Sequence, residues 1–221
     1  MALVDFTAKL HTATKRDYVA RVVEHDKAHC AEVAGRYDKD YWDGDRKYGF
    51  GGYRYDGRWR PVAEAMVKHY GLKPGAKILD VGCGKGFLLH EFKQVLPDCT
   101  VAGFDISDYA LEHAKPEVKP FLTKASAGER FPYADKSFDL VYSVMTLHNL
   151  FAYELKNALQ EMERVSGGAK HITTESYTDE REKANFLYWQ LTCRTFWTPK
   201  EWEWFFKECG YTGDYAYVVF R

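Results

Sequence analysis

Apolar positions along this 221-residue chain change their spacing near residue 75. Before that point they recur every three or four residues, which predicts a helix over 14–37, capped at Thr14, and a second over 60–70. After it, short apolar runs alternate with amphipathic stretches. The predicted strands are 77–83, 100–107, 118–126, 138–144, 169–177 and 215–220. The predicted helices among them are 84–96, 108–115, 151–165 and a Thr198-capped helix from Pro199 to Gly210.

Strands that alternate with helices form βαβ units, whose strands lie parallel in one sheet. The chain is therefore expected to be an α/β protein with a doubly wound, mostly parallel sheet of six or seven strands. The pattern further predicts two parts, a helical and aromatic cap with a substrate lid at 1–59 and a ligand-binding domain at 60–221. In such a sheet, ligands bind beyond the carboxyl ends of the strands, where the strand order reverses.

A glycine-rich turn ends the first predicted strand. Gly82, Gly84 and Gly86 occupy alternate positions, so that the backbone can turn tightly and a ligand can approach it closely. The amides that open the following helix would point at that ligand. Phe87 stands where the dinucleotide fingerprint needs a glycine, which argues against NAD and FAD. Asp105, at the end of the next strand, is placed to accept hydrogen bonds from ribose hydroxyls. A plain turn with a surface Asp is the structural alternative.

These segments resemble the successive motifs of class I methyltransferases that depend on S-adenosylmethionine (SAM). The segments are ILDVGCGKGF at 78–87, FDIS at 104–107, FPYADKSFDLVYSVMTLHNL at 131–150 and RVSGGAKHI at 164–172. The resemblance implies the Rossmann-like methyltransferase fold and SAM as the cofactor. Members of the family often end with two antiparallel strands. Here only 215–220 is a strong candidate, so the sheet is expected to be shortened or to hide a strand near 191–196.

The same resemblance assigns residues to parts of the cofactor. Asp80 would anchor the methionine portion, and Gly82, Cys83, Gly84 and Gly86 would line the turn. Asp105 would hold the ribose and Ile106 would pack on the adenine. Ser126 and Ala127 stand where relatives often have an Asp for the adenine amino group, and Met145 to His148 would flank the sulfonium.

Methyl transfer to a hydroxyl or amine needs a base that accepts the acceptor's proton. His148 and Asn149 follow the fourth strand, and Glu175 and Tyr177 lie at the end of the fifth. His148 is the first choice for the base, with Asn149 and Tyr177 as further catalytic candidates. A purely packing or hydrogen-bonding role for His148 in the loop remains open.

Residues 43–59 combine five glycines, three tyrosines and three arginines, which suggests a lid over the acceptor. Tyr53, Arg54, Tyr55 and Arg58 are the candidate substrate-binding residues. With Arg46, the two arginines could bind a carboxylate or phosphate in forked geometry. A glycine-rich loop with solvated arginines is the alternative.

The composition limits the classes of binding partner and the cellular compartment that are expected for this chain. A formal net charge of −1 argues against nucleic acid. Five cysteines without a C-x-x-C pair indicate neither a disulfide framework nor a zinc site and favour the cytoplasm. No signal peptide, membrane span or metal is expected, and the chain is predicted to be a monomer or a homodimer. Together these features predict O- or N-methylation of a small metabolite that the arginines suggest is anionic. A SAM-using lyase or cyclase that attacks the aminobutyrate chain, and a non-catalytic SAM-binding module, remain the alternatives.

Overall fold

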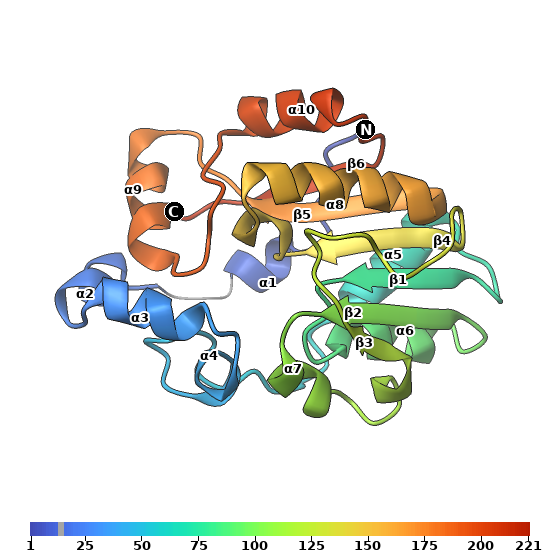
Figure 1. The fold of residues 1–221 in the computed structure, drawn as a ribbon, viewed down its shortest axis with the longest axis horizontal. Coiled ribbons are helices and arrows are strands. Elements are labelled where there is room, and N and C mark those ends of the chain that lie inside the picture. Colours follow the sequence, from blue (N-terminus) through green and yellow to red (C-terminus); the bar gives the residue numbers. More distant parts are fainter. Residues whose placement is uncertain (13–15) are drawn as a thin grey trace.

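The computed structural model describes residues 1–12 and 16–221, so the cap predicted at Thr14 lies outside the described residues. Its centre is one six-stranded sheet in the order β3-β2-β1-β4-β5-β6, with every pair of neighbours parallel (Figure 1). The strands are β1 Lys77–Val81, β2 Thr100–Asp105, β3 Leu122–Lys124, β4 Phe138–Val144, β5 Ser166–Glu175 and β6 Asp214–Val218. The predicted doubly wound parallel sheet is confirmed, and its order reverses between β1 and β4.

The helices precede, connect and flank these strands. They are α1 Ala8–Thr12, α2 Tyr18–Val23, α3 Lys27–Ala34, α4 Lys39–Asp43, α5 Arg60–Tyr70, α6 Phe87–Val95, α7 Asp108–Glu112, α8 Ala152–Val165, α9 Glu180–Trp189 and α10 Pro199–Glu208, with 3₁₀ turns η1 Lys119–Phe121 and η2 Leu147–Asn149. None of the helices in the described ranges is long and apolar enough to cross a membrane.

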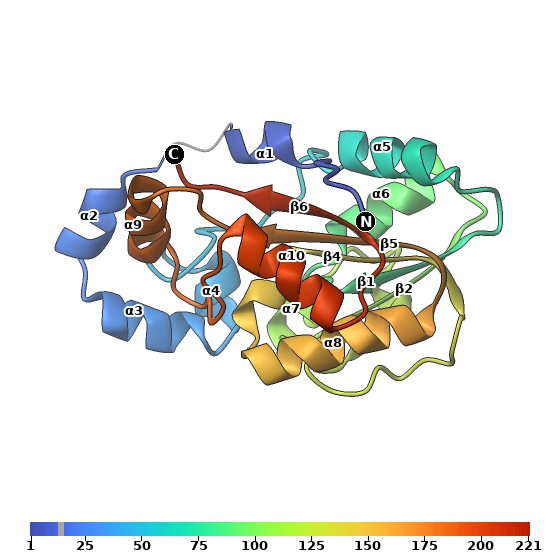
Figure 2. The same cartoon turned by 90° about the horizontal axis from the view of Figure 1, so that it is seen from above.

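Two layers of helices enclose the sheet. Helices α5 and α6 cover one face, where Met66 and Phe92 pack on Ile78 and Tyr142. Helices α8 and α10 cover the other face, where their apolar stripes join one cluster with the strands (Figure 2). Because both faces are covered, the central strands β1, β2 and β4 are almost continuously buried runs, as is usual for parallel sheets.

The N-terminal segment differs from the prediction of one helix over 14–37. The chain there forms α2 and α3, separated at Glu24–Asp26. The Asp26 side chain accepts hydrogen bonds from the amides of Ala28 and His29, and so begins a new helix. Helices α1, α4 and α9 were not predicted. The strand predicted over 118–126 begins only at Leu122, because residues 119–121 around Pro120 form η1.

The end of the sheet is also distinctive. Strand β6 runs parallel to β5, and residues 191–196 form no strand, so the shortened sheet, one of the two expected outcomes, is the one present. The start of the chain covers the outer edge of β6. Tyr215 N donates to Ala2 O at 3.0 Å, and Val4 N donates to Tyr215 O at 2.9 Å. The open edge of the sheet is thereby partly paired.

Helices α2, α3 and α4 lie beyond the carboxyl ends of the strands, on the side where α9 and the C-terminus also lie (Figure 1). We refer to residues 16–59 as the cap. Contacts between α2 and α9 join the cap to the C-terminal half of the chain. The cap therefore stands at the edge of the sheet where the sequence placed the ligand.

Candidate active site

The glycine turn between β1 and α6 has a backbone that only glycine adopts easily. Gly82, Gly84 and Gly86 have φ angles of 79°, 53° and 68°, in the left-handed region. A Cβ at Gly82 would lie 2.3 Å from Thr146, and one at Gly84 would lie 2.8 Å from the Trp42 ring. The turn is therefore tightly enclosed by the segment after β4 and by the cap.

Asp105 joins this turn to the next one. Its two carboxylate oxygens accept hydrogen bonds from Gly84 N at 2.8 Å and Ser107 N at 2.9 Å. Burial raises the pKa of Asp105, although these backbone hydrogen bonds favour its charged form. Ile106 beside it is 55% exposed. A carboxylate oxygen can accept more than one hydrogen bond, so Asp105 retains capacity for hydroxyl donors.

Trp42 of α4 attaches the cap to both turns. Its Nε1 donates to Ser107 Oγ at 2.9 Å and to Tyr37 O at 3.1 Å. The ring stacks on Phe50, with the centroids 5.2 Å apart. The indole is thus a wall of the site rather than part of a loose lid.

A partly buried ion pair reinforces this attachment. Lys85, inside the glycine turn, places its Nζ 2.8 and 2.6 Å from the two carboxylate oxygens of Asp43, and 3.0 Å from Tyr53 O. The Tyr109 hydroxyl donates to Asp43 at 2.9 Å. Burial opposes the charge of Asp43, but Lys85 and Tyr109 outweigh it, and the pKa of Asp43 lies below its usual value.

The segment after β4 carries the polar candidates. Met145 has a φ of 60°, which is unusual for a residue with a side chain. Its amide donates to Thr173 O at 2.8 Å, while the Thr146 hydroxyl donates to Gly82 O at 3.2 Å. These contacts hold the start of η2 against both the glycine turn and β5.

His148 in η2 meets Glu175 at the end of β5. His148 Nε2 lies 3.4 Å from Glu175 Oε2, and both side chains are buried. Burial lowers the pKa of His148 to about 3 and raises that of Glu175 to about 8. Gln190 donates a hydrogen bond to the other oxygen of Glu175. His148 Nδ1, Asn149 Oδ1 and Glu175 Oε2 have no hydrogen-bond partner among the described residues, so the 3.4 Å approach of Nε2 to Oε2 is a close contact and not a hydrogen bond in this structure. The two strand ends therefore present a buried, titratable pair with an unused ring nitrogen.

Comparisons with known proteins match this core. Residues 78–167 match the family model of a methyltransferase domain. An uncharacterized methyltransferase of Synechocystis sp. is 29% identical over 125 residues, which are 56% of each chain. A human U6 snRNA (guanine-N(2))-methyltransferase is 35% identical over 113 residues, which are 47% of this chain and 22% of that protein. The chain thus spans about half or less of these relatives.

A solved geranyl diphosphate methyltransferase, in complex with GPP and sinefungin, has a similar fold. Its TM-score is 0.55 at 16% identity, over 66% of this chain and 57% of that one. The family model and the curated relatives indicate a methyltransferase, and the solved structure agrees in fold. Residues 78–167 therefore match a methyltransferase domain, and the sheet has the fold of class I SAM-dependent methyltransferases.

The structure also describes the contacts of the other residues that the sequence assigned to the cofactor. Asp80 accepts a hydrogen bond from the Tyr142 hydroxyl at 2.9 Å, and burial raises the pKa of Asp80 to about 8. Cys83 is buried, which raises its pKa and disfavours the thiolate. Ser126 Oγ accepts from Gly128 N at 3.2 Å, and Ala127 packs into the core.

The predicted lid residues are held by local contacts. Tyr53 stacks on Phe87, with the centroids 4.9 Å apart, and the Tyr55 hydroxyl donates to Glu91 at 2.6 Å. Arg58 Nε donates to Asp56 at 2.7 Å on the surface, and Arg54 is exposed. The structure therefore brings the two tyrosines against α6, but it does not bring Arg54 and Arg58 to the His148–Glu175 pair.

Tyr177 lies apart from His148. Its ring packs near Phe186, at 6.3 Å, and Lys183 Nζ lies 5.5 Å from its centroid.

Sequence reasoning missed Trp42, Asp43 and Lys85. The one available signal was a lysine inside a glycine turn, since a buried cation requires a partner carboxylate.

Proposed function

We propose that this methyltransferase domain transfers the methyl group of SAM to an oxygen or nitrogen of a small acidic acceptor. The observation that supports this most directly is the buried His148–Glu175 pair at the ends of β4 and β5. His148 lies two residues after Thr146, whose hydroxyl donates to Gly82 O in the glycine turn. A proton acceptor would thus stand beside the expected cofactor site.

The residues around the turn fit an adenosyl cofactor. Asp105 presents a carboxylate at the end of β2 for the ribose hydroxyls, and Ile106 offers an exposed apolar side chain for adenine. Asp80, the turn residues Gly82, Cys83, Gly84 and Gly86, and Met145 would line the methionine portion, with Ser126 and Ala127 near the base. When bound, SAM supplies a methyl group on a positively charged sulfur, a ready electrophile. Sinefungin in the similar structure is a SAM analogue.

His148 and Glu175 would then handle the acceptor's proton as a unit. With the carboxyl protonated, its O–H can donate to His148 Nε2, which leaves the ring proton on Nδ1. Loss of one proton from the pair allows Nε2–H to donate to the carboxylate and frees the Nδ1 lone pair. That nitrogen is one of the buried atoms without a described hydrogen-bond partner, and Glu175 Oε2 is another. The deprotonated pair can therefore accept a proton from the acceptor hydroxyl or amine.

A small acceptor suits the surroundings of the pair. Residues 16–59 cover the strand ends, and Trp42 fixes them to the turns. The formal net charge of −1 does not favour a polyanion, although one relative is named for an RNA substrate. We propose residues 1–59 as an N-terminal unit that contains the cap and the substrate lid, and 60–221 as the catalytic domain, acting as a monomer or homodimer. All five cysteines are free thiols, which suits the cytoplasm.

The test is an assay of the purified chain with methyl-labelled SAM and a panel of small carboxylic and phosphorylated acids, with RNA as a comparison. Formation of S-adenosylhomocysteine (SAH) with label in one acid is the expected result. His148→Ala should abolish transfer while SAH still binds, and His25→Ala, a change at an exposed histidine, should have no effect. Methylthioadenosine as product, label in RNA alone, or no binding of SAM or SAH would overturn the proposal.

A further inference from the structure

Three arginine side chains from the cap gather around one indole ring. The guanidinium carbons of Arg16, Arg21 and Arg46 lie 5.6, 5.0 and 5.0 Å from the centroid of Trp189, the last residue of α9. We call these four residues the arginine cluster. Each cation gains from the aromatic ring, but three like charges this close also repel one another. Such a group is stabilised when an anion joins it.

The described carboxylates do not supply that anion to Arg21 and Arg46. Arg21 Nη1 donates to the carbonyl of Arg46 at 2.8 Å, and Arg46 Nη1 donates to the carbonyl of Gly49. Arg21 Nε is buried with no hydrogen-bond partner in the part of the chain that the structure describes. Burial and the neighbouring guanidinium lower the pKa of both side chains. Both arginines therefore keep unused donors beside another cation.

The cluster lies close to the proposed proton acceptor. Gln190, next to Trp189 in the chain, hydrogen-bonds to Glu175, and the charge of Arg16 acts to lower the pKa of that carboxyl. Opposite charges influence each other in this way only over short distances. An acidic group held by the arginines would thus lie near the His148–Glu175 pair.

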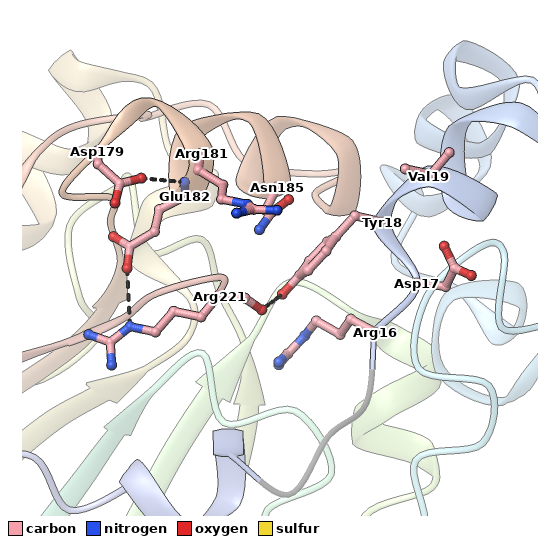
Figure 3. Close-up of a pocket in the computed structure, with 9 residues that line it drawn as sticks. All are labelled: Arg16, Asp17, Tyr18, Val19, Asp179, Arg181, Glu182, Asn185 and Arg221. Atoms are coloured by element: carbon pink, nitrogen blue, oxygen red, sulfur yellow. Dashed lines mark hydrogen bonds and ion pairs between the residues drawn. The ribbon is translucent and has the colours of Figure 1, made fainter.

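Solvent reaches the cluster from outside. A pocket of about 810 Å³ lies between α2 and α9, and Arg16 is one of its lining residues (Figure 3). The acids that line it are already engaged: Asp17 caps α2, Asp179 caps α9, and Glu182 accepts from Arg221 Nε at 3.1 Å. Arg21 and Arg46 do not line this pocket, but Arg46 is exposed at the surface. A small anion can therefore approach the arginines without breaking the core.

We propose that the arginine cluster binds the acidic group of the methyl acceptor, a carboxylate or a phosphate, and so directs the acceptor's nucleophile towards His148 and Glu175. This inference rests on the proposed methyl transfer. It assigns the anion contact to Arg21 and Arg46, supported by Arg16, in place of Arg54 and Arg58. A guanidinium fork matches the oxygens of either anion in two parallel hydrogen bonds.

The test uses inorganic phosphate and acetate, with chloride at equal ionic strength as the reference. Both anions are titrated into the wild type, Arg21→Gln, Arg46→Gln and the control Arg58→Gln, and the melting temperature is recorded. We expect phosphate or acetate to raise the melting temperature of the wild type and of Arg58→Gln above the chloride value. In both cluster variants the apparent Kd should rise about tenfold, as expected for a lost charged hydrogen bond. The anion with the larger effect identifies the acidic group.

Two results would refute anion binding by the arginine cluster. One is a melting temperature of the wild type that is the same in phosphate or acetate as in chloride, and the other is a response of the cluster variants equal to that of the wild type. Arg46→Lys keeps the positive charge but removes the forked guanidinium, and it replaces Arg46→Gln if that variant does not fold. Its response to the anions should lie between those of the wild type and of Arg21→Gln. SAH binding is measured by calorimetry on the same samples. Failure of the wild type to bind SAH would refute the proposed function, whereas the anion titration decides the cluster independently.

Discussion

The Lys85 ammonium and the Asp43 carboxylate form a partly buried contact of 2.6 Å between the glycine turn and the cap, across 42 positions of sequence. Lys85 is only 4% exposed, so its charge depends on this partner. The cap and the cofactor turn are therefore coupled electrostatically as well as through the Trp42 ring.

Asp43→Asn should accordingly destabilise the fold by about 2 kcal/mol, because it leaves a buried cation without its counter-charge. Asp45→Asn is the matched control, since Asp45 is exposed and its Oδ2 lies 3.6 Å from Lys47 Nζ; its effect should be much smaller than that of Asp43→Asn. Urea unfolding at pH 7 measures both. Equal effects of the two changes would refute the coupling.

The same pair predicts a pH dependence of stability. The pKa of Asp43 is depressed in the folded state, so its contribution is present above the unfolded value of about 4 and is lost as the pH falls through the folded pKa. Unfolding curves between pH 3 and 7, in ~1-unit steps, should show a smaller loss of stability in Asp43→Asn than in the wild type. Parallel curves for the two proteins would contradict this.

Glu175 should control the pH profile of methyl transfer. Burial raises its pKa to about 8, so kcat/KM should rise with pH and level off above that value as the pair loses its proton. Glu175→Gln cannot lose this proton, and its amide N–H would donate to His148 Nε2 and leave the proton on Nδ1. The variant should lose at least about 100-fold in kcat and show no rise with pH.

The pH profiles of the wild type and of Glu175→Gln are recorded with the same methyl acceptor. An amine acceptor loses a proton of its own as the pH rises, and the comparison with one acceptor cancels that contribution. SAH affinity in the Gln variant should stay within about twofold of the wild type, since no bond to the cofactor changes. A variant that keeps the rise with pH would remove Glu175 from the proton transfer.

Asp105 should determine cofactor affinity. Asp105→Asn keeps an acceptor oxygen for only one of the amides of Gly84 and Ser107 and sets its NH2 against the other. It also removes the charge that ribose hydroxyls would meet, so SAH should bind more weakly by about 1–3 kcal/mol. Asp108→Asn, three residues on, changes an exposed acid paired with Lys124 and serves as the control. Calorimetry gives both affinities. Unchanged binding in Asp105→Asn would exclude the ribose role.

The sequence predicted what depends on local pattern. Strands β1, β2 and β4 lie close to their predicted bounds because their apolar runs are buried on both faces. The glycine turn and Asp105 were found because a fixed backbone geometry needs those residues at that spacing. His148 and Glu175 were each identified at a strand end, but their pairing follows from the register of β4 and β5, which a single sequence does not encode.

Long-range contacts explain the remaining differences. Nothing in the pattern around Asp43 points to Lys85, and nothing around Arg21 points to Trp189, because such pairs have no periodicity. Arg54 and Arg58 were chosen for their place in an aromatic loop, yet Arg58 forms its ion pair two residues away with Asp56. The pattern did not predict the division between α2 and α3, because the apolar spacing stays helical across Asp26, the N-cap residue of α3.

The cap contact at Gly84 can be separated from the role of this residue in cofactor binding. A Cβ there would lie 2.8 Å from the Trp42 ring, and the residue has a φ of 53°. Gly84→Ala should therefore destabilise the protein without ligand through two effects, the left-handed backbone at about 1–2 kcal/mol and the clash with the indole. In a Trp42→Ala background the clash is absent, so only the backbone cost should remain. A double-mutant cycle of urea unfolding should give a coupling of at least about 1 kcal/mol between the two positions. A coupling near zero would mean that the indole does not rest on the turn, and that glycine is required there for the backbone and the cofactor alone.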